Sequence, residues 1–175
     1  MVWITIVALV ISAGFWFAKP VVDLSPMPQK TAAAKVVTSG TAKPSVSVRK
    51  AALEAFFTKH RCLDADLADY YIYEADQVGM DWRLLPAISF KESTCGRAYI
   101  NSPTLAKNNF WGYGSASALR EYPDLEAGIY NVYSHLKNDR YYAGKSIEAI
   151  LKTYGPSNSP GYAASVMGIM SEISK

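Results

Sequence analysis

The chain has 175 residues, a length that suits one ordinary domain with an accessory segment. Its net charge of +3 comes from one end: residues 1–48 hold four lysines and one aspartate, whereas residues 49–175 hold fourteen basic and fourteen acidic side chains. A nucleic-acid-binding domain would need a basic face, and no basic run interleaved with aromatic residues is present. The composition therefore argues against a nucleic-acid partner.

Residues 1–18 are predicted to be a transmembrane anchor or a signal peptide. The run VWITIVALVISAGFWFA, residues 2–18, is apolar apart from one threonine and one serine and is just long enough to span a bilayer. We expect an uncleaved single-pass anchor, with a cleaved signal peptide as the alternative. No basic residue precedes the run and no small-x-small cleavage site ends it, which favours the anchor. Residues 19–48, rich in Pro, Ala, Thr, Ser and Lys without an aromatic residue, are typical of a flexible, disordered linker.

Residues 49–175 have the apolar spacing of helices and are predicted to form one small all-α domain. Capping residues place helix starts at Asp64, Asp81, Asp124, Ser146 and Ser159. Gly79 and Gly155 are expected to end two of these helices. Pro86 lies early in the second helix, which indicates an irregular first turn or a later start. Between Gly96 and Pro123 the helical spacing fails, and so long a loop in a small domain is usually functional.

The chain has two cysteines, Cys62 and Cys95. In an oxidising compartment they would close a loop of about 34 residues, worth roughly 3–4 kcal/mol on the chain-entropy estimate. The alternative is two buried free thiols. No CxxC motif or Cys/His cluster is present, so we expect no metal site and no cofactor.

Glu92 stands on the apolar face of the second predicted helix. At about 100° per residue, Leu85, Ile88 and Glu92 share one stripe, so the carboxyl group points along the face that enters the core. Burial penalises the charged form of such a group, which suits a general acid that works near neutral pH. The alternative is a glutamate at the edge of the stripe that reaches solvent or pairs with Arg97.

The sequence NNFWGYG, from Asn108 to Gly114, supports a glycan site. Sugar rings have apolar faces and polar edges, so glycan clefts combine flat aromatic rings with amide groups, and glycines let the backbone approach the ligand. The alternative is an aromatic turn that covers the core, a role expected for Phe110 in either case. Trp111 and Tyr113 are the better candidates for substrate contact.

Four motifs in order resemble the lysozyme-like superfamily over roughly residues 50–175. The segment ESTCG at the end of the helix MDWRLLPAIS resembles the active-site helix of lytic transglycosylases and of bacterial peptidoglycan β-N-acetylglucosaminidases (the mannosyl-glycoprotein endo-β-N-acetylglucosaminidase-like family). NNFWGYG is more similar to the Asn-Asn-aromatic-Gly segment of the glucosaminidases than to the Gly-Leu-Met-Gln of the transglycosylases. YPDLEAGIYNVYSHL and LKTYGPSNSPGYAASVMGIM resemble the helix and the closing Tyr-Ala segment that follow in that family.

The resemblance implies a small lysozyme-like domain and a role for each matching residue. Glu92 would be the catalytic acid, and Tyr162 would lie near it and steady the acid or the oxocarbenium-like centre. Ser93 would support the acid and is also expected to contact substrate. The cleft segment would place its residues against substrate: Asn109, Trp111, Gly112 and Tyr113.

The second carboxylate expected of a glucosaminidase is not identified. Glu121, Asp124 and Glu126 are available but surround a helix start, where Asp124 already has a capping role. A site with one acid would instead fit a lytic transglycosylase, in which the 6-hydroxyl of the substrate closes an anhydro ring, or assistance by the N-acetyl group. It would also fit a membrane-tethered glycan-binding or envelope-assembly module without catalysis.

The expected function is therefore hydrolysis of peptidoglycan glycan strands, as an endo-β-N-acetylglucosaminidase with Glu92 as general acid. The domain would be held on the membrane by residues 2–18 and face the cell wall, or be secreted if that segment is cleaved. The lysines after the segment favour the cytoplasm under the positive-inside rule, so the membrane orientation stays open. The oligomeric state is also open.

Overall fold

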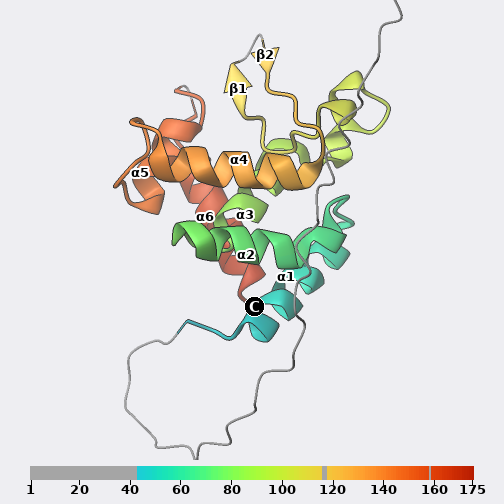
Figure 1. Cartoon of the computed structure of the whole chain (residues 1–175), viewed down its shortest axis with the longest axis vertical. Coiled ribbons are helices and arrows are strands. Elements are labelled where there is room, and N and C mark those ends of the chain that lie inside the picture. Colours follow the sequence, from blue (N-terminus) through green and yellow to red (C-terminus); the bar gives the residue numbers. More distant parts are fainter. Residues whose placement is uncertain (1–42, 116–117, 158) are drawn as a thin grey trace, which may run out of the picture. The chain divides into compact units, whose positions relative to one another are not determined.

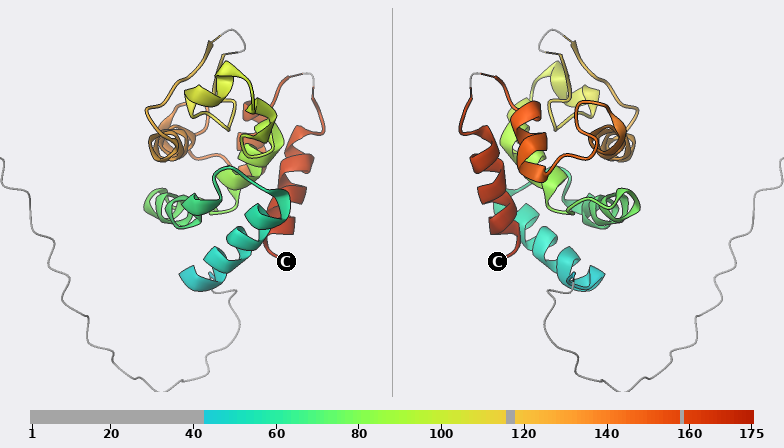
Figure 2. Two further views of the ribbon diagram at one scale, coloured as in Figure 1. Left: turned by 90° about the vertical axis from the view of Figure 1, so that its right-hand side faces the viewer. Right: turned by 90° about the vertical axis from the view of Figure 1, so that its left-hand side faces the viewer.

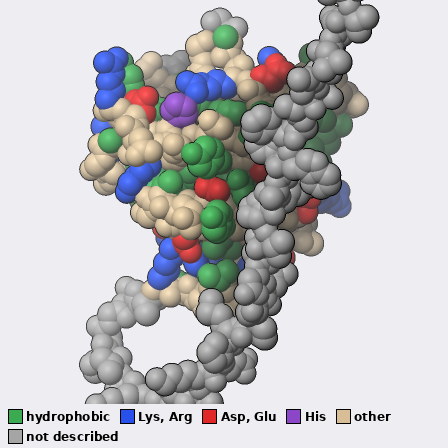
Figure 3. Space-filling view, in the orientation of Figure 1, with side chains coloured by type: hydrophobic (Ala, Val, Ile, Leu, Met, Phe, Trp, Pro, Cys, Tyr) green, Lys and Arg blue, Asp and Glu red, His purple; other side chains and the backbone are tan. Residues whose placement is uncertain are grey.

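The computed structural model describes residues 43–115, 118–157 and 159–175. The expected membrane segment 2–18 and nearly all of the expected linker lie outside these residues. In the described ranges, no helix is both long and apolar enough to cross a bilayer. On the face shown in Figure 3, acidic and basic side chains are interspersed and do not gather in one patch of either sign, as the balanced charge of the domain leads one to expect.

The domain is all-α, as predicted, apart from one small hairpin (Figure 1). Its α-helices are α1 (Val46–His60), α2 (Ala68–Val78), α3 (Leu84–Ser93), α4 (Leu125–Asn138), α5 (Ile147–Tyr154) and α6 (Tyr162–Ile173). Short 3₁₀ turns connect them: η1 (Ala65–Leu67), η2 (Arg97–Tyr99) and η3 (Pro103–Lys107). Strands β1 (Gly114–Ser115) and β2 (Ala118–Leu119) pair in antiparallel fashion within the long loop.

Helix α3 is the centre of the fold, with α2 and α4 on one side and α6 on another (Figures 1 and 2). Its side chains are buried all round the helix: Leu84, Leu85, Ala87 and Ile88 are fully inaccessible. A helix that is apolar on every face belongs in the core. Glu92, in its last turn, is one of the few α3 side chains that reach solvent.

Helix α1 was not predicted, and it begins inside the range expected for the linker. Ser45 caps it by accepting a hydrogen bond from the backbone N–H of Val48, and Leu53, Phe56 and Phe57 enter the core. Its buried Arg49 donates two hydrogen bonds of 2.7 Å to Asp76 on α2. The ordered domain therefore starts earlier than residue 49.

Two of the predicted helix starts are confirmed by side-chain caps. Asp124 accepts from the N–H of Ala127 and begins α4, and Ser146 accepts from the N–H of Ala149 and begins α5. Helix α3 starts late, at Leu84, as the proline at 86 indicated, and Gly79 ends α2 in a left-handed turn. Asp64 stands just before η1, as the predicted start requires, but its side chain forms no cap bond and is buried.

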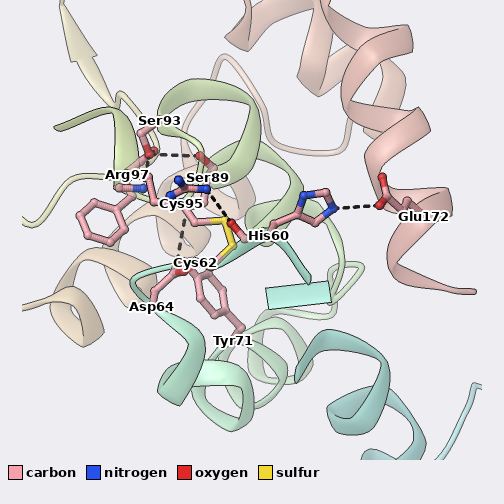
Figure 4. Close-up of a disulfide and its surroundings, with 11 residues drawn as sticks. His60, Cys62, Asp64, Tyr71, Ser89, Ser93, Cys95, Arg97 and Glu172 are labelled. Atoms are coloured by element: carbon pink, nitrogen blue, oxygen red, sulfur yellow. Dashed lines mark hydrogen bonds and ion pairs between the residues drawn. A yellow bond between two sulfur atoms is a disulfide. The ribbon is translucent and has the colours of Figure 1, made fainter. Parts of the chain in front are cut away.

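A disulfide between Cys62 and Cys95 joins the end of α1 to the end of α3, with the two Cα atoms 4.9 Å apart (Figure 4). The backbone N–H of Leu63 donates to the carbonyl of Cys95 beside it, at 3.1 Å. Thr94 and Cys95 both have left-handed backbone angles, φ +53° and +54°, which turn the chain sharply away from α3 just after Glu92. The bridge thus fixes the end of the helix that carries the candidate acid.

Candidate active site

Glu92 and Tyr162 meet where α3 ends and α6 begins. The hydroxyl of Tyr162 donates a hydrogen bond to Glu92 Oε1 over 2.5 Å. Burial, and after it the bond to Glu92, raises the pKa of Tyr162 far above its ordinary value, so the hydroxyl keeps its proton and remains a donor. The structure thus brings together the two residues that the sequence assigned to catalysis.

Gly112 lies over the other oxygen of the same carboxyl group. A Cβ at this position would stand 3.0 Å from Glu92 Oε2, and the backbone has φ +65°, which favours glycine. No hydrogen bond to Oε2 is present within the described part of the chain. One carboxyl oxygen is therefore held by Tyr162, and the other faces a residue without a side chain.

Ser93 does not contact the Glu92 carboxyl group or the surface. It is buried, and its hydroxyl proton is directed to the carbonyl of Phe110 (2.7 Å), with the carbonyl of Ser89 as a more distant acceptor (3.1 Å). Its Oγ accepts from the N–H of Gly96 (2.7 Å). The expectation of substrate binding by Ser93 was wrong. Its hydroxyl fixes the aromatic loop to the end of α3, and so supports the acid through the backbone.

Asn109 is fully buried as well, which rules out the expected contact with substrate. Its Nδ2 donates to the carbonyls of Tyr113 (2.7 Å) and Arg120 (2.8 Å), and its Oδ1 accepts from the N–H of Tyr113 (3.0 Å). An amide with both ends engaged by backbone groups clamps a loop. Asn109 therefore shapes the chain around Tyr113 and does not read a ligand.

Trp111 was also expected to contact substrate, and this prediction is wrong because its ring is completely buried. It meets Tyr71 and Tyr122 edge to face, with ring centroids 6.2 and 6.5 Å away. Its carbonyl accepts a hydrogen bond of 2.7 Å from the hydroxyl of Tyr154. The alternative reading of this segment, an aromatic turn packed on the core, is the correct one for Trp111.

A series of tyrosine rings in mutual contact begins beside the acid. Tyr162 stacks on Tyr154 with centroids 6.4 Å apart, and Tyr154 in turn lies 6.0 Å from Tyr113 and 6.4 Å from Tyr142. Tyr113 is partly exposed, and its ring also contacts His135. The sequence analysis gave Tyr154 no role in the site, although this residue lies in the segment LKTYGPSNSPGYAASVMGIM that carries part of the resemblance.

Two of the three acids considered as a second carboxylate are engaged by other groups, and the third, Glu126, is exposed on α4. Asp124 caps α4, and Glu121 pairs with Lys107 at 3.7 Å. Glu92 is the carboxylate that raises the pKa of both Tyr154 and Tyr162, after the larger effect of burial. Asp139, which the sequence analysis did not consider, acts in the same direction on Tyr113 and Tyr142. Of these two acids, Glu92 is the one that accepts a hydrogen bond from a tyrosine hydroxyl, that of Tyr162.

The described residues bring one set of metal-ligating side chains together: Cys62, Asp64 and Cys95, with ligand atoms within 4.8 Å of one another. The two sulfur atoms are bonded to each other, so they are not free to bind a metal. Asp64 is fully buried and accepts from the hydroxyls of Tyr71 (2.6 Å) and Ser89 (3.3 Å) on one oxygen (Figure 4). Burial raises its pKa to about 6, against the smaller opposing effect of these hydrogen bonds.

Comparisons of the chain with protein-family models, with curated proteins and with solved structures find no match.

Proposed function

We propose that the domain is a lysozyme-like peptidoglycan glycosidase in which Glu92 is the general acid. The observation that carries the proposal is the asymmetry of the Glu92 carboxyl group. Oε1 is held by the Tyr162 hydroxyl at 2.5 Å, whereas Oε2 faces Gly112, where an added Cβ would stand only 3.0 Å from it. A carboxyl group fixed on one oxygen and open on the other is arranged to deliver a proton from the open side.

In the proposed reaction, Glu92 Oε2 gives its proton to the glycosidic oxygen between two amino sugars as the bond from that oxygen to the anomeric carbon breaks. Positive charge then develops on the anomeric carbon and the ring oxygen, and the Glu92 carboxylate left behind stabilises it. Tyr162 keeps the carboxylate oriented through this change, because its own proton stays in place. Addition of water to the anomeric carbon completes hydrolysis, and its released proton restores Glu92.

Two alternatives follow from the single acid held in place at this site. If the 6-hydroxyl of the sugar attacks the anomeric carbon in place of water, the product is an anhydro ring and the protein is a lytic transglycosylase. If no bond is cut, the same surface would serve a glycan-binding or envelope-assembly module. Both remain candidates because Glu121 and Asp124 are engaged elsewhere.

The proposal includes the location that the substrate requires. Residues 2–18 would anchor the chain in a membrane, with the domain on the wall side, or the domain would be secreted after cleavage. A disulfide between Cys62 and Cys95 is consistent with an oxidising compartment. The proposed reaction uses no cofactor.

Product chemistry tests the proposal. The full chain, purified in detergent, would digest isolated peptidoglycan, and the soluble fragments would be analysed by mass spectrometry before and after borohydride reduction. Reducing N-acetylglucosamine ends identify a glucosaminidase, and anhydro-muramoyl ends identify a transglycosylase. If a correctly folded protein releases no fragment but is retained on peptidoglycan, the catalytic proposal fails and the binding module is favoured.

A further inference from the structure

Arg120, just after β2, is held in a defined position near the tyrosine rings. Its guanidinium carbon lies 5.2 Å from the centroid of the Tyr113 ring, and its Nη1 lies 2.8 Å from Nε2 of His135 on α4. The Tyr113 and His135 rings also stack, with centroids 5.3 Å apart and planes 27° apart. The three side chains therefore form one cluster.

The backbone under this cluster is fixed by the buried Asn109. Its amide bonds to the carbonyls of both Tyr113 and Arg120, and the N–H of Arg120 donates to the carbonyl of Tyr113 at 3.0 Å. A cation that is positioned before a ligand arrives loses less freedom on binding, so its bonds to the ligand contribute more to affinity.

The guanidinium has binding capacity left over. Arginine has no acceptor atom, so the bond to His135 requires a neutral imidazole that accepts at Nε2, and it uses one of five N–H donors. Within the described ranges, no carboxylate lies within ion-pair distance of Arg120, in contrast to Arg49 and Arg83, which pair with aspartates at 2.7 and 2.5 Å. The acid nearest in the chain to His135, Asp139, accepts from the N–H of Tyr141.

The cluster is continuous with the candidate active site. Tyr113 directly follows Gly112, which lies beside Glu92 Oε2, and its ring contacts Tyr154, which stacks on Tyr162. A glycan strand that places its scissile bond at Glu92 would therefore bring a neighbouring sugar, or the group attached to it, toward Arg120.

We propose that Arg120, supported by Tyr113 and His135, forms a subsite for a carboxylate attached to the muramoyl sugar of the substrate. The planar guanidinium presents paired donors that match a carboxylate. The sugar rings of peptidoglycan are uncharged, so this carboxylate belongs either to the peptide branch or, where the peptide has been removed, to the lactyl group. The inference rests on the proposed glycan substrate and extends it to the charged branch.

The test measures binding, so that it does not depend on turnover. The full chain with Glu92→Gln would be titrated with three soluble oligosaccharides of matched length: peptide-bearing strands, amidase-treated strands with free lactyl carboxylates, and uncharged N-acetylglucosamine oligomers. In this background, Arg120→Gln is expected to weaken the binding of at least one carboxylate-bearing ligand about tenfold, while the binding of the uncharged oligomer stays the same. A loss of this size is expected when a charge-assisted hydrogen-bonded pair is removed. The ligand that responds identifies the source of the carboxylate.

Arg140 provides a matched control. Its guanidinium carbon lies 4.8 Å from the centroid of the exposed Tyr141 ring, an arginine–tyrosine pair like that of Arg120 and Tyr113. Arg140→Gln should leave the affinity ratios at their original values, and Arg120→Lys should retain part of the preference for the charged ligands. Equal ratios in the original protein and in Arg120→Gln, or no binding of any oligosaccharide, would overturn the subsite. If the protein prefers the charged strands but never cleaves peptidoglycan, only the catalytic proposal is overturned and the subsite stands.

Discussion

The hydroxyl of Tyr162 lies 2.5 Å from Glu92 Oε1 and joins the first residue of α6 to the last turn of α3, across 70 positions of sequence. This hydrogen bond thus links the C-terminal end of α3 to the N-terminal end of α6. Tyr162 is nearly buried, whereas Glu92 is partly exposed, so the bond holds a solvent-accessible acid from the core side.

Tyr162→Phe removes this bond and keeps the ring stacked on Tyr154. We expect kcat for peptidoglycan cleavage to fall roughly tenfold with little change in KM, because a misoriented acid transfers its proton less well while substrate contacts remain. Steady-state kinetics on solubilised glycan strands would measure both constants. The control is Tyr141→Phe, which removes an exposed hydroxyl bonded to Arg140. An equal loss in both variants would show that the Tyr162 bond has no special role.

Gly112→Ala tests the open side of the carboxyl group. The new Cβ would stand 3.0 Å from Glu92 Oε2 on a backbone with φ +65°. We expect a stability loss of about 1–2 kcal/mol from backbone strain, with a loss of activity well beyond what that unfolding explains. Gly144→Ala is the matched control, since φ is +73° there but no atom lies within 4 Å of the added Cβ. Its stability loss should be similar and its activity per folded molecule intact; parallel activity losses would contradict the account.

The sequence predicted the parts of the fold that depend on local signals. Asp124 and Ser146 cap helices because their side chains reach a backbone N–H three residues on, and Gly79 ends a helix because it adopts a left-handed turn. Helix α1 was missed because its start lies in a Ser/Val-rich stretch that reads as linker. Only tertiary contacts, such as the pairing of Arg49 with Asp76, show that this stretch is ordered.

The sequence analysis predicted that the two central residues of the candidate site lie together. Its predictions for several of the surrounding residues were wrong. Glu92 and Tyr162 are in contact, but Asn109, Trp111 and Ser93 are buried and serve the loop. Amides and aromatic rings can face either a ligand or the core, and residue type alone does not decide between the two. The decision depends on which backbone groups in the loop need partners, and this becomes visible only once the loop is folded.

Asp64 should make stability depend on pH. Burial raises its pKa to about 6, whereas in the unfolded chain an aspartate titrates near 4. Between about pH 4 and 6 the folded protein keeps a proton that the unfolded chain has lost, so the free energy of unfolding falls as pH rises through this window, by roughly 3 kcal/mol in all. This loss in the free energy of unfolding is absent below about pH 4 and complete above about pH 6.

Urea denaturation at intervals from pH 4 to 8 would measure this slope. Asp64→Asn carries no titratable group and should lose that part of the slope. Asp66→Asn changes an exposed acid whose charge has a smaller effect on the Asp64 pKa than burial or the hydrogen bonds have, so it should keep most of the slope. If the profiles of the original protein and Asp64→Asn run parallel, Asp64 does not titrate in this window.

The disulfide should contribute to stability through the loop that it closes. Cys62 and Cys95 are 33 positions apart, and a loop of this length restricts the unfolded chain by roughly 3–4 kcal/mol. Cys62→Ala with Cys95→Ala is expected to lower the free energy of unfolding by about that amount. Thiol counting on the denatured, unreduced protein should find no free thiol, and two free thiols would contradict the pairing.

The most direct measurement of the central claim compares peptidoglycan cleavage by the full chain, by Glu92→Gln and by Glu148→Gln, which changes an exposed glutamate on α5. Removal of a general acid is expected to slow cleavage roughly 100- to 10,000-fold, with the fold and glycan binding retained. The account predicts this loss for Glu92→Gln alone. Full activity of Glu92→Gln would contradict it.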